Sequence, residues 1–135
     1  RSPVVQGKAL VVPLDNPSEA IAGSPSKIGA PQWLDLGGRG VRDMAYSDLH
    51  KAYFIVAGPA DGKGKFDLYK WSGTGQPELL ADKLPKGFRP EAMLVESLTT
   101  IRFLSDDGDD PMGGADRCKD APVGAQRFRY FEVTL

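Results

Sequence analysis

The sequence predicts an all-β fold, and two observations carry that prediction. Apolar runs of about five to seven residues, rich in Val, Ile, Tyr and Phe, recur along all 135 residues and are separated by clusters of Gly, Pro and Asp. These runs lack the helical spacing of apolar residues, whereas short β-branched and aromatic runs between turn residues are typical of strands. Since the length suits one domain, we expect residues 1–135 to form a single all-β domain.

The second observation is an internal repeat. Residues 38–46 align with residues 87–95 at an offset of 49, and residues 53–57 align with residues 101–105 at an offset of 48. Periods of roughly 40 to 50 residues built from short strands are typical of β-propeller blades. We therefore expect two blade-like repeats, at about 38–86 and 87–135, and a partial blade that contributes the strands within residues 9–36.

Each expected strand is a short apolar run between turn signals. The run 53–57 is apolar at every position, so both of its faces should be covered, as they are when blades stack side by side. The segments 16–31 and 109–124 are rich in Pro, Gly, Ser and Asp and read as loops. In chain order the strands are expected at residues 9–14, 32–36, 41–46, 52–56, 66–71, 78–80, 91–95, 100–104 and 127–135.

These nine strands amount to about two blades and one strand, whereas propellers usually contain four to eight blades of four strands. A ring cannot close within this chain. The protein is therefore expected to be a fragment or a minimal propeller, or to reach a ring as a homo-oligomer. The alternative is a compact β-sandwich made of the same strands.

Composition excludes several functional classes. Seventeen Lys and Arg are scattered among eighteen Asp and Glu, for a formal charge of −1, which removes the electrostatic case for nucleic acid. No apolar run approaches the roughly 18 residues of a membrane-spanning helix. We expect a soluble protein whose partner is a small polar ligand or another protein. Bacterial cytoplasm, periplasm and the secreted state all stay open.

Polar residues gather at one predicted rim. In an antiparallel blade, the entry to the first strand and the exit from the second lie at the same end. Such a rim could join neighbouring blades by ion pairs, or it could bind an anionic or hydroxylated ligand, since the planar arginine fork suits both tasks. The ligand-binding candidates at this rim are Arg42, Asp43, Arg89, Glu91 and Ser105.

The acidic loop after residues 100–104 is the strongest chemical signal. Asp106, Asp107, Asp109 and Asp110 surround Gly108, and calcium prefers several oxygen ligands on a turning loop of this kind. These four aspartates are the candidate metal ligands. The other interpretation is a solvated acidic turn in which Asp106 or Asp107 bonds its own backbone.

The same residues permit catalysis. Glu91 or Asp43 could act as a general base on a metal-bound water while the arginines bind the anion, which would make the protein a metal-assisted hydrolase of phosphate or carboxylic esters. A Ser-His-Asp triad is excluded, because Ser105 and the single histidine, His50, fall at opposite rims.

Several motifs resemble a known family. They are Gly40-Val41-Arg42-Asp43, Ile55-Val56-Ala57-Gly58-Pro59, Leu68-Tyr69-Lys70-Trp71, Phe88-Arg89-Pro90-Glu91, Ser105-Asp106-Asp107-Gly108-Asp109 and Gln126-Arg127-Phe128-Arg129.

In this order the motifs resemble the C-terminal part of a propeller-like bacterial family known only as a domain of unknown function. The resemblance covers the chain from about Trp33 onward and implies a truncated or minimal version of longer proteins. The Ser-Asp-Asp-Gly element is also similar to one in phytase-like and esterase-like propellers. Those relatives have Pro-Glu-Gly where this chain has Pro90-Glu91-Ala92.

Three functions follow as hypotheses. The first is a binding module whose acidic, calcium-loaded rim binds a polar or anionic ligand or a protein partner. The second is the metal-assisted hydrolase, and the third is a purely structural fragment that acts in assembly.

Overall fold

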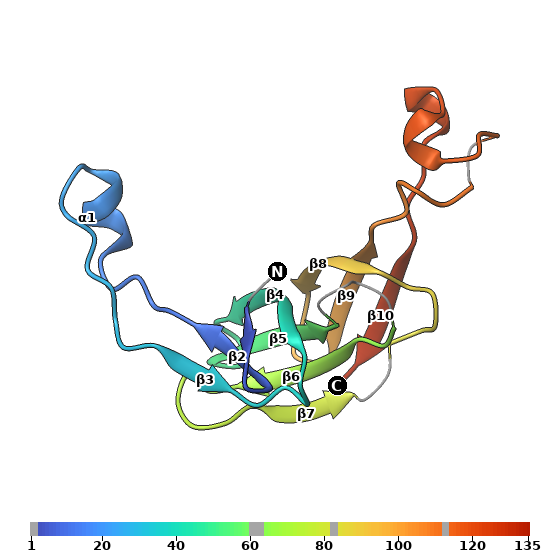
Figure 1. Ribbon diagram of the computed structural model, residues 1–135. Coiled ribbons are helices and arrows are strands. Elements are labelled where there is room, and N and C mark those ends of the chain that lie inside the picture. The colour runs from blue at the N-terminus through green and yellow to red at the C-terminus, as the bar shows by residue number, and fades with distance from the viewer. Residues whose placement is uncertain (1–2, 60–63, 82–83, 112–113) are drawn as a thin grey trace.

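The computed structural model describes residues 3–59, 64–81, 84–111 and 114–135, and it confirms the all-β class (Figure 1). The described residues form three antiparallel sheets, none of which closes into a barrel or ring. The first sheet contains β1 (Val4–Val5), β2 (Lys8–Val11) and β3 (Gln32–Leu34); the middle sheet contains β4 (Gly40–Ser47), β5 (Ala52–Gly58), β6 (Asp67–Trp71) and β7 (Glu78–Ala81); the third sheet contains β8 (Pro90–Val95), β9 (Thr100–Ser105) and β10 (Tyr130–Thr134).

Within each sheet the strands pair in chain order, as expected for a blade. The middle sheet has the four strands of a whole blade, and each flanking sheet has three. The strand β1 was not expected. It is only two residues long, which is too short for an apolar run that would predict a strand. The turn from β1 to β2 has positive φ at Gln6 and Gly7. The propeller interpretation stays a prediction.

The strand β10 begins at Tyr130, later than the expected start at residue 127. Arg127 and Arg129 have other backbone partners: the N–H of Arg127 donates to Cys118 Sγ, and that of Arg129 donates to an Asp107 carboxylate oxygen. The polar anchoring of this segment therefore delays the start of the ladder with β9.

Two apolar clusters hold the sheets together, one on each face of the middle sheet. Ile55 and Ala57 of β5 pack with Ala9 and Leu34 of the first sheet. The alternate residues Phe54 and Val56 pack in the cluster that contains Ile101 and Phe103 of the third sheet; all of these side chains are buried. The middle strand β5 is thus covered on both faces, which explains why its sequence is apolar at every position.

Two arms project from the sheets on the same side (Figure 1). The segment 16–31, expected to be a loop, contains the five-residue helix α1 (Pro17–Ile21), and the arm is held at its base by a bridge between Leu14 and Ile28. The second arm lies between β9 and β10 and contains two short 3₁₀ turns, Cys118–Asp120 and Val123–Ala125.

Candidate functional site

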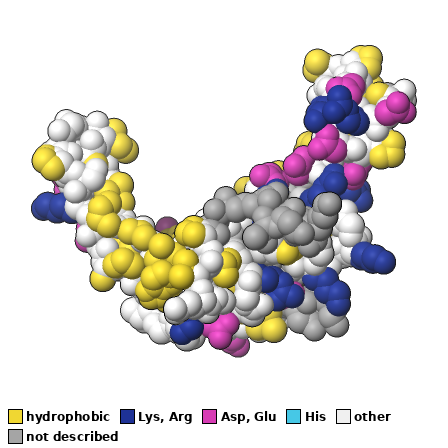
Figure 2. Space-filling view, viewed as in Figure 1, with side chains coloured by type: hydrophobic (Ala, Val, Ile, Leu, Met, Phe, Trp, Pro, Cys, Tyr) yellow, Lys and Arg dark blue, Asp and Glu magenta, His cyan; other side chains and the backbone are white. Residues whose placement is uncertain are grey.

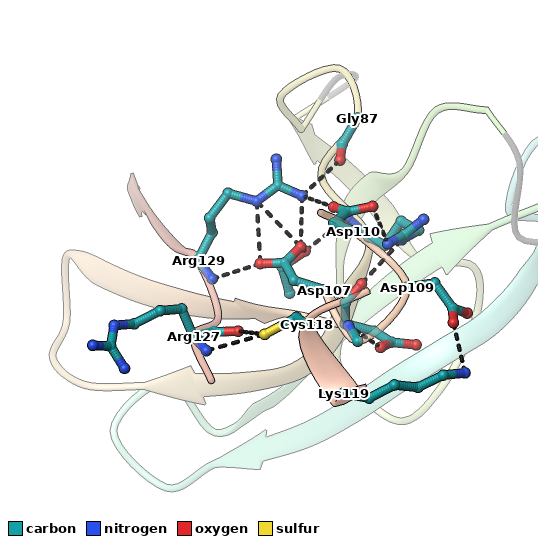
Figure 3. Close-up of polar contacts among 12 residues, drawn as sticks. Gly87, Asp107, Asp109, Asp110, Cys118, Lys119, Arg127 and Arg129 are labelled. Atoms are coloured by element: carbon teal, nitrogen blue, oxygen red, sulfur yellow. Dashed lines mark hydrogen bonds and ion pairs between the residues drawn. The ribbon is translucent and has the colours of Figure 1, made fainter. Parts of the chain in front are cut away.

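The acidic loop begins directly after β9 and is folded around Asp107. Asp107 is 2% exposed. Its carboxylate accepts hydrogen bonds from the Arg129 guanidinium, from the Arg129 backbone N–H and from the Ser105 hydroxyl, at 2.5 to 3.1 Å (Figure 3). The loop is thereby fixed to the residue that precedes β10.

The titration of Asp107 reflects these contacts. Burial raises the pKa of a carboxyl group, but the side-chain and backbone hydrogen bonds from Arg129 and the hydroxyl of Ser105 lower it by more, and the pKa of Asp107 falls to about 2. The carboxylate is therefore charged at neutral pH. A buried charge of this kind is stable only because Arg129 neutralises it.

The neighbouring carboxylate, Asp110, lies between two arginines. Its Oδ1 accepts from Arg89 at 2.7 Å and its Oδ2 accepts from Arg129 at 2.7 Å (Figure 3). Arg89 also donates to the Asp106 carbonyl, and Arg129 also donates to the Gly87 carbonyl. The two arginines thus connect the acidic loop with the segment that enters β8.

The remaining two aspartates contact the chain on the outside of the loop. Asp109 pairs with Lys119 at 2.6 Å, and this pairing lowers the pKa of Asp109. Asp106 accepts the backbone N–H of Gly108 through its own carboxylate, which is the turn contact considered in the sequence. Each of the four predicted metal ligands therefore accepts a hydrogen bond or ion pair from this chain.

No group of three or more His, Cys, Asp or Glu side chains among the described residues has the arrangement of a metal site. Calcium binding by Asp106, Asp107, Asp109 and Asp110 stays a prediction. For Asp107 and Asp110 to coordinate an ion, their oxygens would have to leave Arg89 and Arg129.

Arg42 and Glu91 form a separate ion pair, which joins the middle and third sheets. These two residues are at equivalent positions of the repeat, 49 residues apart, and each sits where the strand ladder skips a residue: between Val41 and Asp43 in β4 and between Pro90 and Ala92 in β8. A β-bulge re-aims a side chain, and here two bulges direct opposite charges toward each other. Arg42 Nε also donates to the Pro90 carbonyl at 3.0 Å.

The candidate general bases, Asp43 and Glu91, contact other groups of the described chain. Asp43 is half-buried, and its Oδ1 accepts the backbone N–H of Met44 at 2.9 Å. Glu91 is exposed and pairs with Arg42. Ser105 accepts from the backbone of Arg89 while it donates to Asp107, so its hydroxyl is part of the loop's hydrogen-bond network.

His50 belongs to another end of the sheets. Its Nδ1 is 2.9 Å from Ser47 Oγ and its Nε2 is 3.0 Å from the Leu98 carbonyl, and the ring stands edge-on against Phe54. These contacts connect the β4–β5 turn with the β8–β9 turn. The residue is half-buried and interacts with both sheets.

Sequence reasoning missed Arg129 and Lys119, which neutralise three of the four aspartates. Arg129 was expected inside a strand, where its charge carried no signal, and Lys119 lies in a loop with no periodic pattern. The one available signal was the excess of carboxylates: four acidic residues within five positions require cations, and these two residues supply charge from the following segment.

A second feature is an exposed apolar surface on the first sheet. Val5, Lys8, Leu10 and Trp33 lie on the side of the sheet away from the middle sheet; we name this surface the first end face. Figure 2 shows hydrophobic side chains gathered over β2 and β3 and continuing toward α1. Trp33 is 43% exposed. A hollow of about 340 Å³ beside it is lined by Val5, Gln6, Lys8 and Trp33.

Comparison with known proteins gives no relative for this chain. No protein-family model matches it, and neither the curated proteins nor the solved structures contain a match. Among the described residues, no helix is both long and apolar enough to span a membrane.

Proposed function

We propose that this chain is a propeller-type protein-interaction module, and that its binding surface is the first end face. The observation that carries the proposal is the pair of exposed apolar side chains, Val5 and Trp33, which line a hollow together with Gln6 and Lys8. Contiguous apolar surface of this kind marks interaction sites in soluble proteins, and tryptophan is enriched among residues that dominate binding.

The polar rim has a structural role in this proposal. Arg42 and Glu91 join two sheets, and Arg89 and Arg129 hold the acidic loop against the entry to β8 and β10. The carboxylates that would bind a cation or activate a water already accept hydrogen bonds from the chain. The rim therefore supports binding by fixing the relative positions of the sheets.

Photo-crosslinking tests the proposal. A photoreactive phenylalanine derivative at position 33 is expected to crosslink to a polypeptide in living cells of the source organism. The same residue at position 49 is the control, because Leu49 is 60% exposed and lies in the turn between β4 and β5, away from the first end face. Equal crosslinking at both positions, or none at position 33, would contradict the proposal.

A further inference from the structure

We infer that the partner of the first end face is a second copy of this chain, which binds through the outer face of its third sheet. This inference rests on the proposed function and names its partner. We call that outer face, formed by Leu94, Arg102, Leu104, Tyr130 and Glu132, the second end face. The association is head-to-tail, since two different surfaces meet.

The stacking inside the chain supplies the first argument. The middle sheet uses two different faces: Ile55 faces the first sheet, and Phe54 faces the third sheet. At the repeat offset of 48, Ile55 aligns with Phe103 and Phe54 aligns with Arg102. Phe103 packs on the preceding sheet, the middle one, just as Ile55 packs on the first sheet. Arg102, the equivalent of Phe54, lies on the opposite side of the third sheet, on the second end face.

The second end face therefore corresponds to the Phe54 side of the middle sheet, which packs on the third sheet. The first end face, in turn, corresponds to the Ile55 side of the middle sheet, which packs on the first sheet. These two kinds of face already meet twice inside each chain, at the two apolar clusters. Joining the end faces of two chains would repeat that contact.

Shape supplies the second argument. Tyr130 projects from the second end face and is 63% exposed; the Arg102 guanidinium lies 5.2 Å from the centre of its ring. The first end face has the hollow of about 340 Å³ beside Trp33. An aromatic side chain that enters a pocket is the typical anchor of a protein interface.

Charge supplies the third argument. Arg102 pairs with two carboxylates, Glu96 at 2.9 Å and Glu132 at 2.7 Å, so this group carries one excess negative charge. Lys8 lies on the first end face and has no ion-pair partner among the residues that the structure describes. The two end faces therefore carry opposite charge, which favours their contact over contact between two like faces.

Two chains joined in this way carry six sheets, three from each. This number lies within the four to eight blades of closed propellers, and a head-to-tail arrangement ends in a ring when the rotation closes. We therefore expect a dimer with two equivalent contacts.

Sedimentation velocity across a dilution series of the purified chain tests the inference. The wild type is expected to reach twice the monomer mass of 14.6 kDa. Trp33→Asp and Tyr130→Asp are each expected to stay monomeric, with dissociation constants raised at least about tenfold. Both positions are exposed, and a cooperative melting transition in each variant would show that it folds. Leu49→Asp is the matched control and should dimerise like the wild type.

The decisive sample is the equimolar mixture of the two monomeric variants. Each retains the end face that the other has lost, so the mixture is expected to form a heterodimer through one intact contact. A monomeric wild type, a dimeric Trp33→Asp variant or a monomeric mixture would each overturn head-to-tail pairing. If the wild type is monomeric while position 33 crosslinks to a different protein, the interaction module stands and the second copy is excluded.

Discussion

Asp107 and Arg129 hold the acidic loop to the third sheet through a contact that depends on charge. The Asp107 carboxylate is buried and accepts from the Arg129 guanidinium, the Arg129 backbone and the Ser105 hydroxyl. Removing one partner of a buried pair leaves the other without compensation, which costs more than the pair itself contributes. The loop and the second arm should therefore loosen together when this carboxylate is neutralised.

Neutralising Asp107 by acid gives a pH-dependent prediction. Its pKa is about 2 in the folded chain, below the ordinary value of 3.8, so its contribution to the free energy of unfolding is present above pH 4 and is lost as the pH falls toward 2. The difference corresponds to about 2 kcal/mol. Urea unfolding of the wild type and Asp107→Asn at pH 6 and at pH 2.5 checks this.

We expect Asp107→Asn to be less stable at pH 6 and the difference in the free energy of unfolding to narrow at pH 2.5, which lies between the unfolded and folded pKa values of Asp107. Asp109→Asn is the control, because Asp109 is exposed and pairs only at the surface with Lys119. An equal gap between the wild type and Asp107→Asn at both pH values would show that the charge of Asp107 does not stabilise the fold.

At the scale of the elements, the ion pair between Arg42 and Glu91 connects the middle sheet to the third sheet. Arg42 is mostly buried and Glu91 is about half exposed, so solvent screens this pair less than one in which both side chains are exposed. A double-mutant cycle with Arg42→Ala and Glu91→Ala is expected to give a coupling of about 1 kcal/mol in the free energy of unfolding.

The comparison for that cycle is Arg117 with Asp120, an exposed ion pair in the second arm, away from both end faces. Their coupling should be smaller and should weaken with added salt. A coupling near zero between Arg42 and Glu91 would show that this ion pair does not help to hold the middle and third sheets together.

The end of β5 is closely packed against Phe66. Gly58 lies under the ring of Phe66, and a Cβ at position 58 would come within 2.3 Å of that ring. Gly58→Ala is therefore expected to destabilise the chain by about 1 to 3 kcal/mol, the range for overpacked cores. Thermal unfolding measures it.

Gly124 is the matched control for Gly58→Ala. A Cβ at Gly124 meets nothing within 4 Å, and the residue lies in the second arm. Gly124→Ala should leave the melting temperature nearly unchanged. Equal effects of the two substitutions would contradict the packing described for β5.

For the whole molecule, the ion pairs of the acidic loop lead to an expectation about the effect of calcium on stability. Asp107 and Asp110 direct their oxygens at Arg89 and Arg129, so a cation would have to displace two guanidinium groups. Calcium is therefore expected to leave the melting temperature unchanged relative to chelator. A rise in the melting temperature that disappears in Asp109→Asn would instead establish the acidic loop as a cation site.

The all-β class and most strand positions could be predicted from the sequence because β strands have a local apolar pattern. Tyr53, Phe54 and Ile55 show this pattern most clearly. The alignment also placed Arg42 and Glu91 at equivalent positions. Other features depend on contacts between distant segments. Asp107 reads as one more acidic turn residue until Arg129, 22 positions later, is seen beside it.

The first end face was missed for a similar reason. Trp33 was expected in a strand, but the side of the sheet that it occupies depends on its pairing with Leu10 and on which face the middle sheet covers. Such information arises only when the sheets have stacked. A short strand such as β1 leaves too few residues for any pattern.

Contact between the two end faces can be followed by ¹⁹F NMR of the chain labelled with 5-fluorotryptophan. The two tryptophans differ in place: Trp33 lies on the first end face, whereas Trp71 is buried and donates its indole N–H to the Gly75 carbonyl. With rising protein concentration, the Trp33 resonance is expected to shift while that of Trp71 stays fixed. A Trp33 resonance that stays constant up to millimolar concentration and coincides with that of the Tyr130→Asp variant would contradict head-to-tail association.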